Sequence, residues 1–341
     1  MTFKNILFRT FLATALFWAV ACEKPEPENG STNPDKGDVE LPGTSEINGT
    51  AILEGNNLVG LVSDSSTGKG IAGVAVSDGY SVVKTDANGV YQFAGSRYAK
   101  TVFISLPADY QVPLDANKKP AFYKVGITRN QVNRNDFKLT PLTESEENFT
   151  FVAIGDPQCA NDKEVSRYQN ETINDIVNTL SSNQIAGKYK NAYAMTLGDI
   201  VNDTPEMWEK LVASMENVQI GSNKYLPIFQ CIGNHDHNAK ASSDMTAVEN
   251  FNSHFGPTDY SFNRGKAHIV VMDNVVCTYT NNKSWSYEAG FSNAQLAWLK
   301  ADLDAVENKA DKMLILCCHI PFRGGANSGG ATMNKDKNYD E

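Results

Sequence analysis

From residue 148 onward the sequence alternates short apolar runs with segments of helical periodicity, and this alternation restricts the fold more than any other feature. Apolar runs of this length predict strands at 149–154, 192–197, 225–232, 268–272 and 313–318. Apolar side chains spaced three and four residues apart predict helices at 173–180, 208–215 and 296–306. Strands that alternate with helices indicate an α/β domain with a largely buried sheet.

A polar motif follows four of these predicted strands. The motifs are Gly155-Asp156-Pro157-Gln158, Gly198-Asp199-Ile200-Val201-Asn202-Asp203, Gly233-Asn234-His235-Asp236-His237 and His319-Ile320-Pro321. Ligands of α/β sheets gather at the carboxyl ends of strands, and carboxylate, amide and imidazole groups suit hard or borderline divalent cations. Glycine before each acidic or amide residue lets the backbone turn tightly near an ion. The pattern therefore predicts a metal site at one edge of the sheet.

The order and spacing of these motifs resemble those of the calcineurin-like metallophosphoesterase family over about residues 148–341. The resemblance implies a four-layered α/β sandwich. It also implies two divalent metal ions, such as Mn, Fe or Zn, and hydrolysis of phosphoesters by a hydroxide that bridges them. The expected substrate is a phosphorylated small molecule or lipid.

The same resemblance assigns roles to individual residues. Asp156 and Gln158 are expected to hold the first metal ion, Asp199 to bridge both ions, and Asn234 and His319 to hold the second. His235 is expected to face the substrate phosphate and to protonate the leaving oxygen, and Asp236 to orient His235.

Three departures from the family pattern qualify these roles. Gln158 replaces the histidine of the usual D-x-H motif, and Asn202 occupies the acidic position of the shorter G-D-x-x-D motif, with Asp203 beside it. No G-H-x-H motif follows His319. We therefore expect the sandwich to be incomplete at its C-terminus, with His237 as a possible substitute ligand. The alternative function is a lipid-anchored binding module whose phosphoesterase domain is incomplete and inactive.

Residues 55–142 read as a separate, small all-β sandwich. Val59 and Leu61 alternate with polar neighbours, as do Val74 and Val76, and turn residues separate the runs. The run 85–93 predicts a hairpin. The segment resembles the carboxypeptidase-regulatory or transthyretin-like domains that precede many secreted enzymes, and we expect it to act as a spacer or packing module.

The N-terminus predicts export and lipid anchoring. Residues 1–21 combine basic residues with a short apolar run, as in a signal peptide, and Cys22 follows small residues as in a bacterial lipobox. Residues 22–54 form an acidic, proline-rich linker. The expected location is the bacterial envelope, either the periplasm or the outer-membrane and cell surface.

Charge and cysteine content exclude other classes. The net charge of −10 argues against nucleic-acid binding, which needs a basic face. Five cysteines remain after Cys22, an odd number that favours buried free thiols.

Cys317 and Arg323 have the C-x5-R spacing of cysteine phosphatases, but Pro321 removes one of the backbone amides that such a phosphate loop requires. His254 and His268 are expected to be packing or surface residues.

Overall fold

The computed structural model describes residues 45–182, 191–279 and 285–322. The predicted signal peptide, Cys22 and the first part of the predicted linker lie outside these described residues, as do Arg323 and the polar end of the chain. Within the described ranges, no helix has both the length and the apolar character needed to cross a bilayer.

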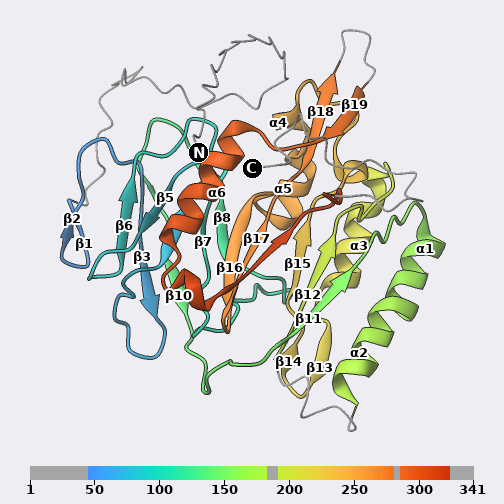
Figure 1. The fold of residues 1–341 in the computed structure, drawn as a ribbon, viewed down its shortest axis with the longest axis horizontal. Coiled ribbons are helices and arrows are strands. Elements are labelled where there is room, and N and C mark those ends of the chain that lie inside the picture. Colours follow the sequence, from blue (N-terminus) through green and yellow to red (C-terminus); the bar gives the residue numbers. More distant parts are fainter. Residues whose placement is uncertain (1–44, 183–190, 280–284, 323–341) are drawn as a thin grey trace, which may run out of the picture.

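Two three-stranded sheets form the centre of the second domain (Figure 1). The first is parallel and has the order β11 (Thr150–Ile154), β12 (Ala192–Leu197), β15 (Ile228–Cys231). The second has the order β16 (Tyr260–Arg264), β17 (Ala267–Val271), β20 (Met313–Cys317), with β17 parallel to β20. Two hairpins accompany them: β13 (Gln219–Gly221) with β14 (Lys224–Tyr225), and β18 (Val275–Tyr279) with β19 (Trp285–Ala289).

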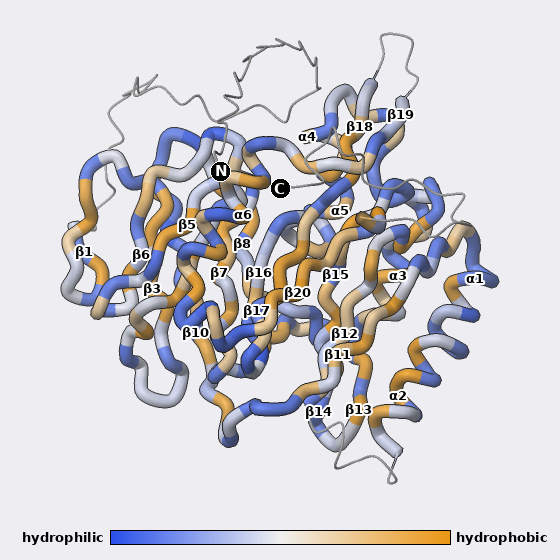
Figure 2. The backbone as a smooth tube through the Cα atoms, viewed as in Figure 1, coloured by the Kyte–Doolittle hydropathy of each residue, from blue (hydrophilic) through white to orange (hydrophobic). Residues whose placement is uncertain are grey.

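The two sheets pack face to face because their strands are apolar on both sides. In β12, Ala192 and Ala194 join the core on the helical side, whereas Tyr193 and Met195 join the core between the sheets. Phe229 and Phe262 stack across that inner core with ring centroids 4.0 Å apart. Figure 2 shows the corresponding concentration of apolar residues along the central strands.

Helices complete the layers. The helices are α1 (Asp162–Arg167), α2 (Asn174–Ser181), α3 (Trp208–Met215), α4 (Asp244–Ala247), α5 (Glu249–Phe255) and α6 (Asn293–Ala305). A π-helical segment at Tyr168–Ile173 joins α1 to α2. Side chains of α1, α2, α3 and α5 share one core with the first sheet, and Trp298 of α6 belongs to the core of the second. The mixed α/β fold predicted from the sequence is confirmed.

The N-terminal domain consists of short strands in two four-stranded sheets. Their bounds are β3 (Leu58–Asp64), β4 (Ala75–Ser77), β5 (Val82–Lys84), β6 (Val90–Phe93), β7 (Thr101–Ile104), β8 (Tyr123–Val125), β9 (Asn133–Arg134) and β10 (Phe137–Leu139). One sheet has the order β10-β3-β6, with β9 also on β3, and the other has the order β5-β4-β7-β8.

The prediction of a hairpin at 85–93 is wrong. The turn is present, and Asp86 Oδ1 accepts hydrogen bonds from the backbone nitrogens of Asn88 and Val90. However, β5 pairs with β4 while β6 pairs with β3, so the turn connects the two sheets instead of two paired strands. Local turn chemistry is the same in both cases, which explains the error.

The predicted linker also extends too far. The strands β1 (Glu46–Ile47) and β2 (Thr50–Ala51) form a small hairpin. Ile47 and Ile52 are buried against Val59 and Val90 of the β domain. The apolar side chains of this hairpin supply the burial that a linker lacks, so the end of the segment belongs to the domain.

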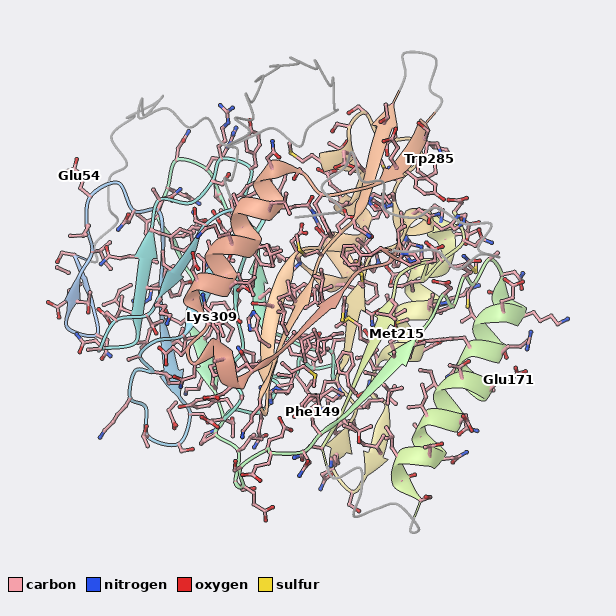
Figure 3. All side chains as sticks on the ribbon, in the orientation of Figure 1. Glu54, Phe149, Glu171, Met215, Trp285 and Lys309 are labelled. Carbon is pink, nitrogen blue, oxygen red and sulfur yellow. The ribbon has the colours of Figure 1, made fainter. Side chains whose placement is uncertain are left out.

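The two domains share one hydrophobic core. The cluster that contains Phe103 of the β domain also contains Phe262 and Trp298. Trp298 is fully buried, donates from Nε1 to Ser77 Oγ at 3.0 Å, and meets the Phe103 ring edge-on at 6.4 Å. A continuous core of this kind fixes the position of the β domain beside α6, which Figure 3 shows with its side chains.

Candidate metal centre

The polar motifs meet where the strands of both sheets end. Asp156 follows β11, Asp199 follows β12, Asn234 follows β15, and His319 follows β20. Because β11, β12 and β15 are parallel, and β20 runs parallel to its neighbour β17, the carboxyl ends align. One ligand atom from each of Asp156, Asp199 and His319 lies within 4.8 Å of the other two. The structure therefore brings together the side chains that the sequence placed at the strand ends.

Asp199 is the buried centre of this cluster, and its two oxygens face different groups. Oδ2 accepts a hydrogen bond from Gln158 Nε2 at 2.8 Å. Oδ1 accepts one from the backbone nitrogen of His235 at 2.9 Å and lies 3.3 Å from His319 Nε2. Burial opposes ionisation of Asp199, but these hydrogen bonds and the charge of His319 lower the pKa of the carboxyl.

His319 joins the two sheets at this point. Its Nδ1 lies 2.8 Å from the carbonyl oxygen of Leu197, and its Nε2 lies 3.1 Å from Asn234 Oδ1. Although burial opposes protonation of the ring, the hydrogen bond and charge of Asp199 raise the pKa of His319 to about 9. Both ring nitrogens thus face acceptors, and a cation, here a proton, is favoured between Nε2 and the surrounding oxygens.

The backbone around the cluster is unusually shaped. Asp156, Gln158, Asp199 and Asp203 all have positive φ, a costly region for residues with a Cβ. Such strain concentrates at functional sites. The loops are held in this shape by each other, since the backbone nitrogen of Gln158 donates to the carbonyl of Asp199 at 2.8 Å.

Glycine is required before two of the motif residues but not before the third. Gly198 has φ +94°, and a Cβ there would lie 2.5 Å from His319 Nδ1. A Cβ on Gly233 would overlap the backbone nitrogen and Oδ1 of Asp199. Gly155 has neither a positive φ nor a neighbour within 4 Å of an added Cβ, so the turn at this position does not require the glycine that the sequence pattern suggested.

The donor chemistry of the cluster fits divalent cations. Carboxylates of Asp156 and Asp199, the amide oxygen of Asn234 and Nε2 of His319 converge on one small region. Gln158 now directs Nε2 at Asp199, and a half turn of its amide would present the oxygen instead. His319 also shows the arrangement common to metal-binding histidines, in which the second ring nitrogen donates to a backbone carbonyl.

His235 lies beside the cluster, but its predicted partner is wrong. Nδ1 of His235 is 3.0 Å from Asp203 Oδ2, within ion-pair range, and Nε2 is 4.0 Å from Asp199 Oδ2. Asp236 instead accepts backbone hydrogen bonds from Ile200 and Val201 through Oδ1 and from Gly233 through Oδ2. Its carboxylate is occupied with tying two loops together, which leaves Asp203 as the neighbour of the imidazole.

Burial raises the pKa of Asp236 to about 7, although the three backbone N–H donors favour its charged form. The side chain is almost completely buried. This location suits a group that supports the loops and does not suit direct contact with a substrate.

Other sequence candidates lie elsewhere. His237 is fully buried and directs Nε2 towards Asp273, so it does not join Asp156, Asp199 and His319. His254 stacks on Trp208, and His268 contacts Asp302 in the core, as expected for packing residues. Cys317 lies at the end of β20, where burial raises the pKa of its thiol to about 11, which opposes a nucleophilic role.

The hairpin β18–β19 was not predicted from the sequence. Burial and the negative charges of Asp199 and Asp203 raise the pKa of the Tyr287 hydroxyl on β19. Trp285 stacks on Tyr287 with ring centroids 5.8 Å apart. Figure 3 labels Trp285 on this hairpin, at the end of the molecule towards which β20 points. The only sequence signal was the aromatic spacing, which is common in exposed strands.

The chain is similar to two family models. A model described as calcineurin-like phosphoesterase matches residues 149–340, more than half of the chain. A model described as the N terminal of calcineurin-like phosphoesterase matches residues 56–142. No curated protein matches the sequence significantly.

Proposed function

Because this chain belongs to the calcineurin-like phosphoesterase family, a family whose domain supports metal-dependent hydrolysis of phosphoesters, we propose that it carries a dinuclear metal centre. The proposed substrates are phosphorylated small molecules or lipids, with no role for nucleic acid. The net charge of −10 supports this choice, since metal ions can attract phosphate within an acidic protein whereas a nucleic-acid backbone needs a basic face.

The observation that carries the proposal is the position of Asp199. Its two carboxylate oxygens face two different sets of donors, Gln158 on one side and His319 on the other. A carboxylate in this position has the geometry of a bridging ligand. Asp156 and Gln158 would then hold one ion, and Asn234 and His319 the other, with Asp199 shared.

When bound, the two ions would activate water and neutralise charge on the phosphate oxygens. The protein's own residues supply the remaining functions. The loops after β11, β12 and β15 hold the ligands rigidly, because Asp236 and the backbone of Gln158 tie them to one another. Preorganised groups of this kind need no rearrangement during the reaction.

His235 is suited to act on the substrate. Its side chain is 30% exposed, more than that of Asp199 at 4%, and it stands at the edge of the ligand cluster. Asp203 Oδ2 lies 3.0 Å from His235 Nδ1 and can orient the ring, and an imidazole in this position can donate a proton to the leaving oxygen.

The direct test measures metal content and turnover together. The full chain, the Asp199→Asn variant and the Asp175→Asn variant are loaded with Mn²⁺ and supplied with a chromogenic phosphomonoester and a phosphodiester. Asp175 is an exposed carboxylate in the first turn of α2, on the outer helical layer, and serves as a matched control. We expect Asp199→Asn to lose most of its bound metal and its turnover, and Asp175→Asn to behave as the parent.

Two results would contradict the proposal. If Asp199→Asn retains as much metal as the parent, Asp199 does not bridge two ions. If the parent binds two ions per chain and hydrolyses neither type of ester, the alternative of an inactive, lipid-anchored binding module is favoured.

A further inference from the structure

A second group of potential metal ligands lies in the interior, separate from the centre described above. It consists of His237, Asp244 and Cys277, all buried, with one ligand atom from each within 4.8 Å of the others. Asp273 joins them, since its Oδ2 lies 3.3 Å from His237 Nε2. We propose that these four residues form a closed structural site for one borderline transition-metal ion of the Zn²⁺ type.

The four residues come from four different segments. His237 lies in the loop after β15, and Asp244 is the first residue of α4. Asp273 lies in the segment after β17, and Cys277 lies within β18. The backbone holds them in register, because Asp244 Oδ1 accepts a hydrogen bond from the Cys277 nitrogen at 2.7 Å and Asp273 Oδ1 accepts one from Val275 at 2.9 Å. A site assembled from distant segments requires the folded chain.

The hydrogen bonding of His237 fixes which ring nitrogen is available. Nδ1 lies 2.8 Å from the carbonyl oxygen of Gly233, which can only accept, so Nδ1 carries a proton. Nε2 is then directed at the Asp273 carboxylate, another acceptor. Either a proton, carried by Nε2 or by the carboxyl, or a metal ion must therefore lie between them. A histidine that donates Nδ1–H to a backbone carbonyl is the usual arrangement for a metal ligand.

The donor types favour the metal ion. Asp244 and Asp273 are buried, at 7% and 1% exposure. A divalent ion supplies two positive charges and the Cys277 thiolate that it binds adds one negative charge, so the net charge equals that with one proton on Nε2, but only the ion uses the Cys277 sulfur as a ligand. One imidazole, one thiolate and two carboxylates provide the four ligands of a closed tetrahedral site.

The distances are compatible with such a site after a small contraction. Metal–ligand distances of about 2.0–2.3 Å place the ligand atoms of a tetrahedral ion roughly 3.3–3.8 Å from one another. The separation of 3.3 Å between His237 Nε2 and Asp273 Oδ2 already meets this condition. The ligand atoms of His237, Asp244 and Cys277 lie within 4.8 Å of one another and need up to about 1 Å of inward movement, and Asp273 joins the set through its contact with His237.

This site would stabilise the loop that carries the first centre. His237 holds Gly233, the residue before Asn234, through its Nδ1. Binding an ion at Nε2 would therefore fix the loop after β15 to α4 and to the base of the β18–β19 hairpin. The ion's role is structural, because all its ligands are enclosed.

Cobalt substitution tests the proposal on the full chain. The protein is produced in medium that contains Co²⁺ as the supplied transition metal, so that a buried site can load as the chain folds. Coordination by a thiolate gives a sulfur-to-cobalt charge-transfer band in the near ultraviolet. The residues proposed for the first centre include no cysteine, so this band reports on the second site alone.

We expect the band in the parent and in Asp199→Asn, and we expect it to disappear in Cys277→Ser together with about one equivalent of metal. Cys231→Ser is the matched control, because Cys231 is another buried cysteine that does not belong to the cluster. The Cys231→Ser variant should keep the band.

Absence of the band from the cobalt-grown parent overturns the proposal, as does persistence of the band in Cys277→Ser. The parent spectrum decides even if the Cys277 variant fails to fold. Loss of catalysis in Asp199→Asn with the band retained separates this site from the proposed function.

Discussion

The imidazole of His235 lies next to the ligand cluster without belonging to it. Its Nδ1 contacts Asp203, and its Nε2 is 4.0 Å from Asp199. We predict that His235→Ala keeps its bound metal but loses roughly 100-fold or more in kcat on esters with poor leaving groups, because a general acid contributes most when the leaving oxygen needs a proton. The loss should be smaller for aryl phosphates. Rates on both ester types, with metal content measured in parallel, check this prediction.

Asp203→Asn is the companion variant. It removes the charge 3.0 Å from the ring but leaves the imidazole in place, so its loss of kcat should be smaller than that of His235→Ala. A fall in bound metal that matches the fall in activity of His235→Ala would show that His235 is a ligand and that the assigned role is wrong.

Two glycines of the motifs provide a residue-level test of crowding. Gly233→Ala forces a methyl group against Asp199, whereas the methyl of Gly155→Ala enters open space. We predict that Gly233→Ala lowers the free energy of unfolding by about 1–3 kcal/mol and weakens metal binding, as expected for overpacking beside a proposed ligand. Gly155→Ala should match the parent in both. Denaturant unfolding and metal titration make the comparison, and equal behaviour of the two variants would refute the crowding argument.

At the scale of elements, one buried side chain of α6 contacts both domains. Trp298 is fully buried, donates a hydrogen bond to Ser77 and packs on Phe103. We predict that Trp298→Ala costs about 3–5 kcal/mol of unfolding free energy, the usual range for a buried tryptophan. Because the cores are continuous, both domains should become less stable together. Thermal unfolding followed by far-ultraviolet and near-ultraviolet circular dichroism measures this effect.

Trp285→Ala is the matched substitution for that experiment. Trp285 is half-buried on the β18–β19 hairpin, where it stacks mainly on Tyr287, so its loss should cost much less. Separate transitions in the Trp298 variant, with only one of them shifted, would show that the domains are energetically independent despite the shared core.

At the scale of the whole molecule, the proposed attachment to a membrane would depend on Cys22. The basic start, the apolar run and the small residues before Cys22 support acylation at this position. We predict that Cys22→Ala moves the protein from the membrane fraction to the soluble fraction after export. Fractionation of cells that express the parent and the variant is the measurement; a variant that stays membrane-bound to the same extent would contradict the lipoprotein proposal.

Much of the molecule was predictable because its signals are local. The strand at Ala192–Leu197 and the helix at Trp208–Met215 have the predicted bounds, since each shows its own periodicity. The meeting of Asp156, Asp199 and His319 also followed from the sequence, because carboxyl ends of parallel strands lie on one edge. The hairpin predicted at 85–93 failed because a tight turn can join paired strands or opposite sheets with the same residues.

The sequence by itself determined the order of strands and helices, the family and the place of the candidate metal ligands, because all three are encoded in local periodicity and in motifs a few residues long. Only the tertiary structure decided that Asp203 rather than Asp236 accompanies His235, and that His237 faces Asp273 and Cys277 in the interior. It also joined the β domain to α6 in one core. These contacts depend on how the loops and sheets pack against one another, and residues 30 or more positions apart carry no periodic signal of that packing.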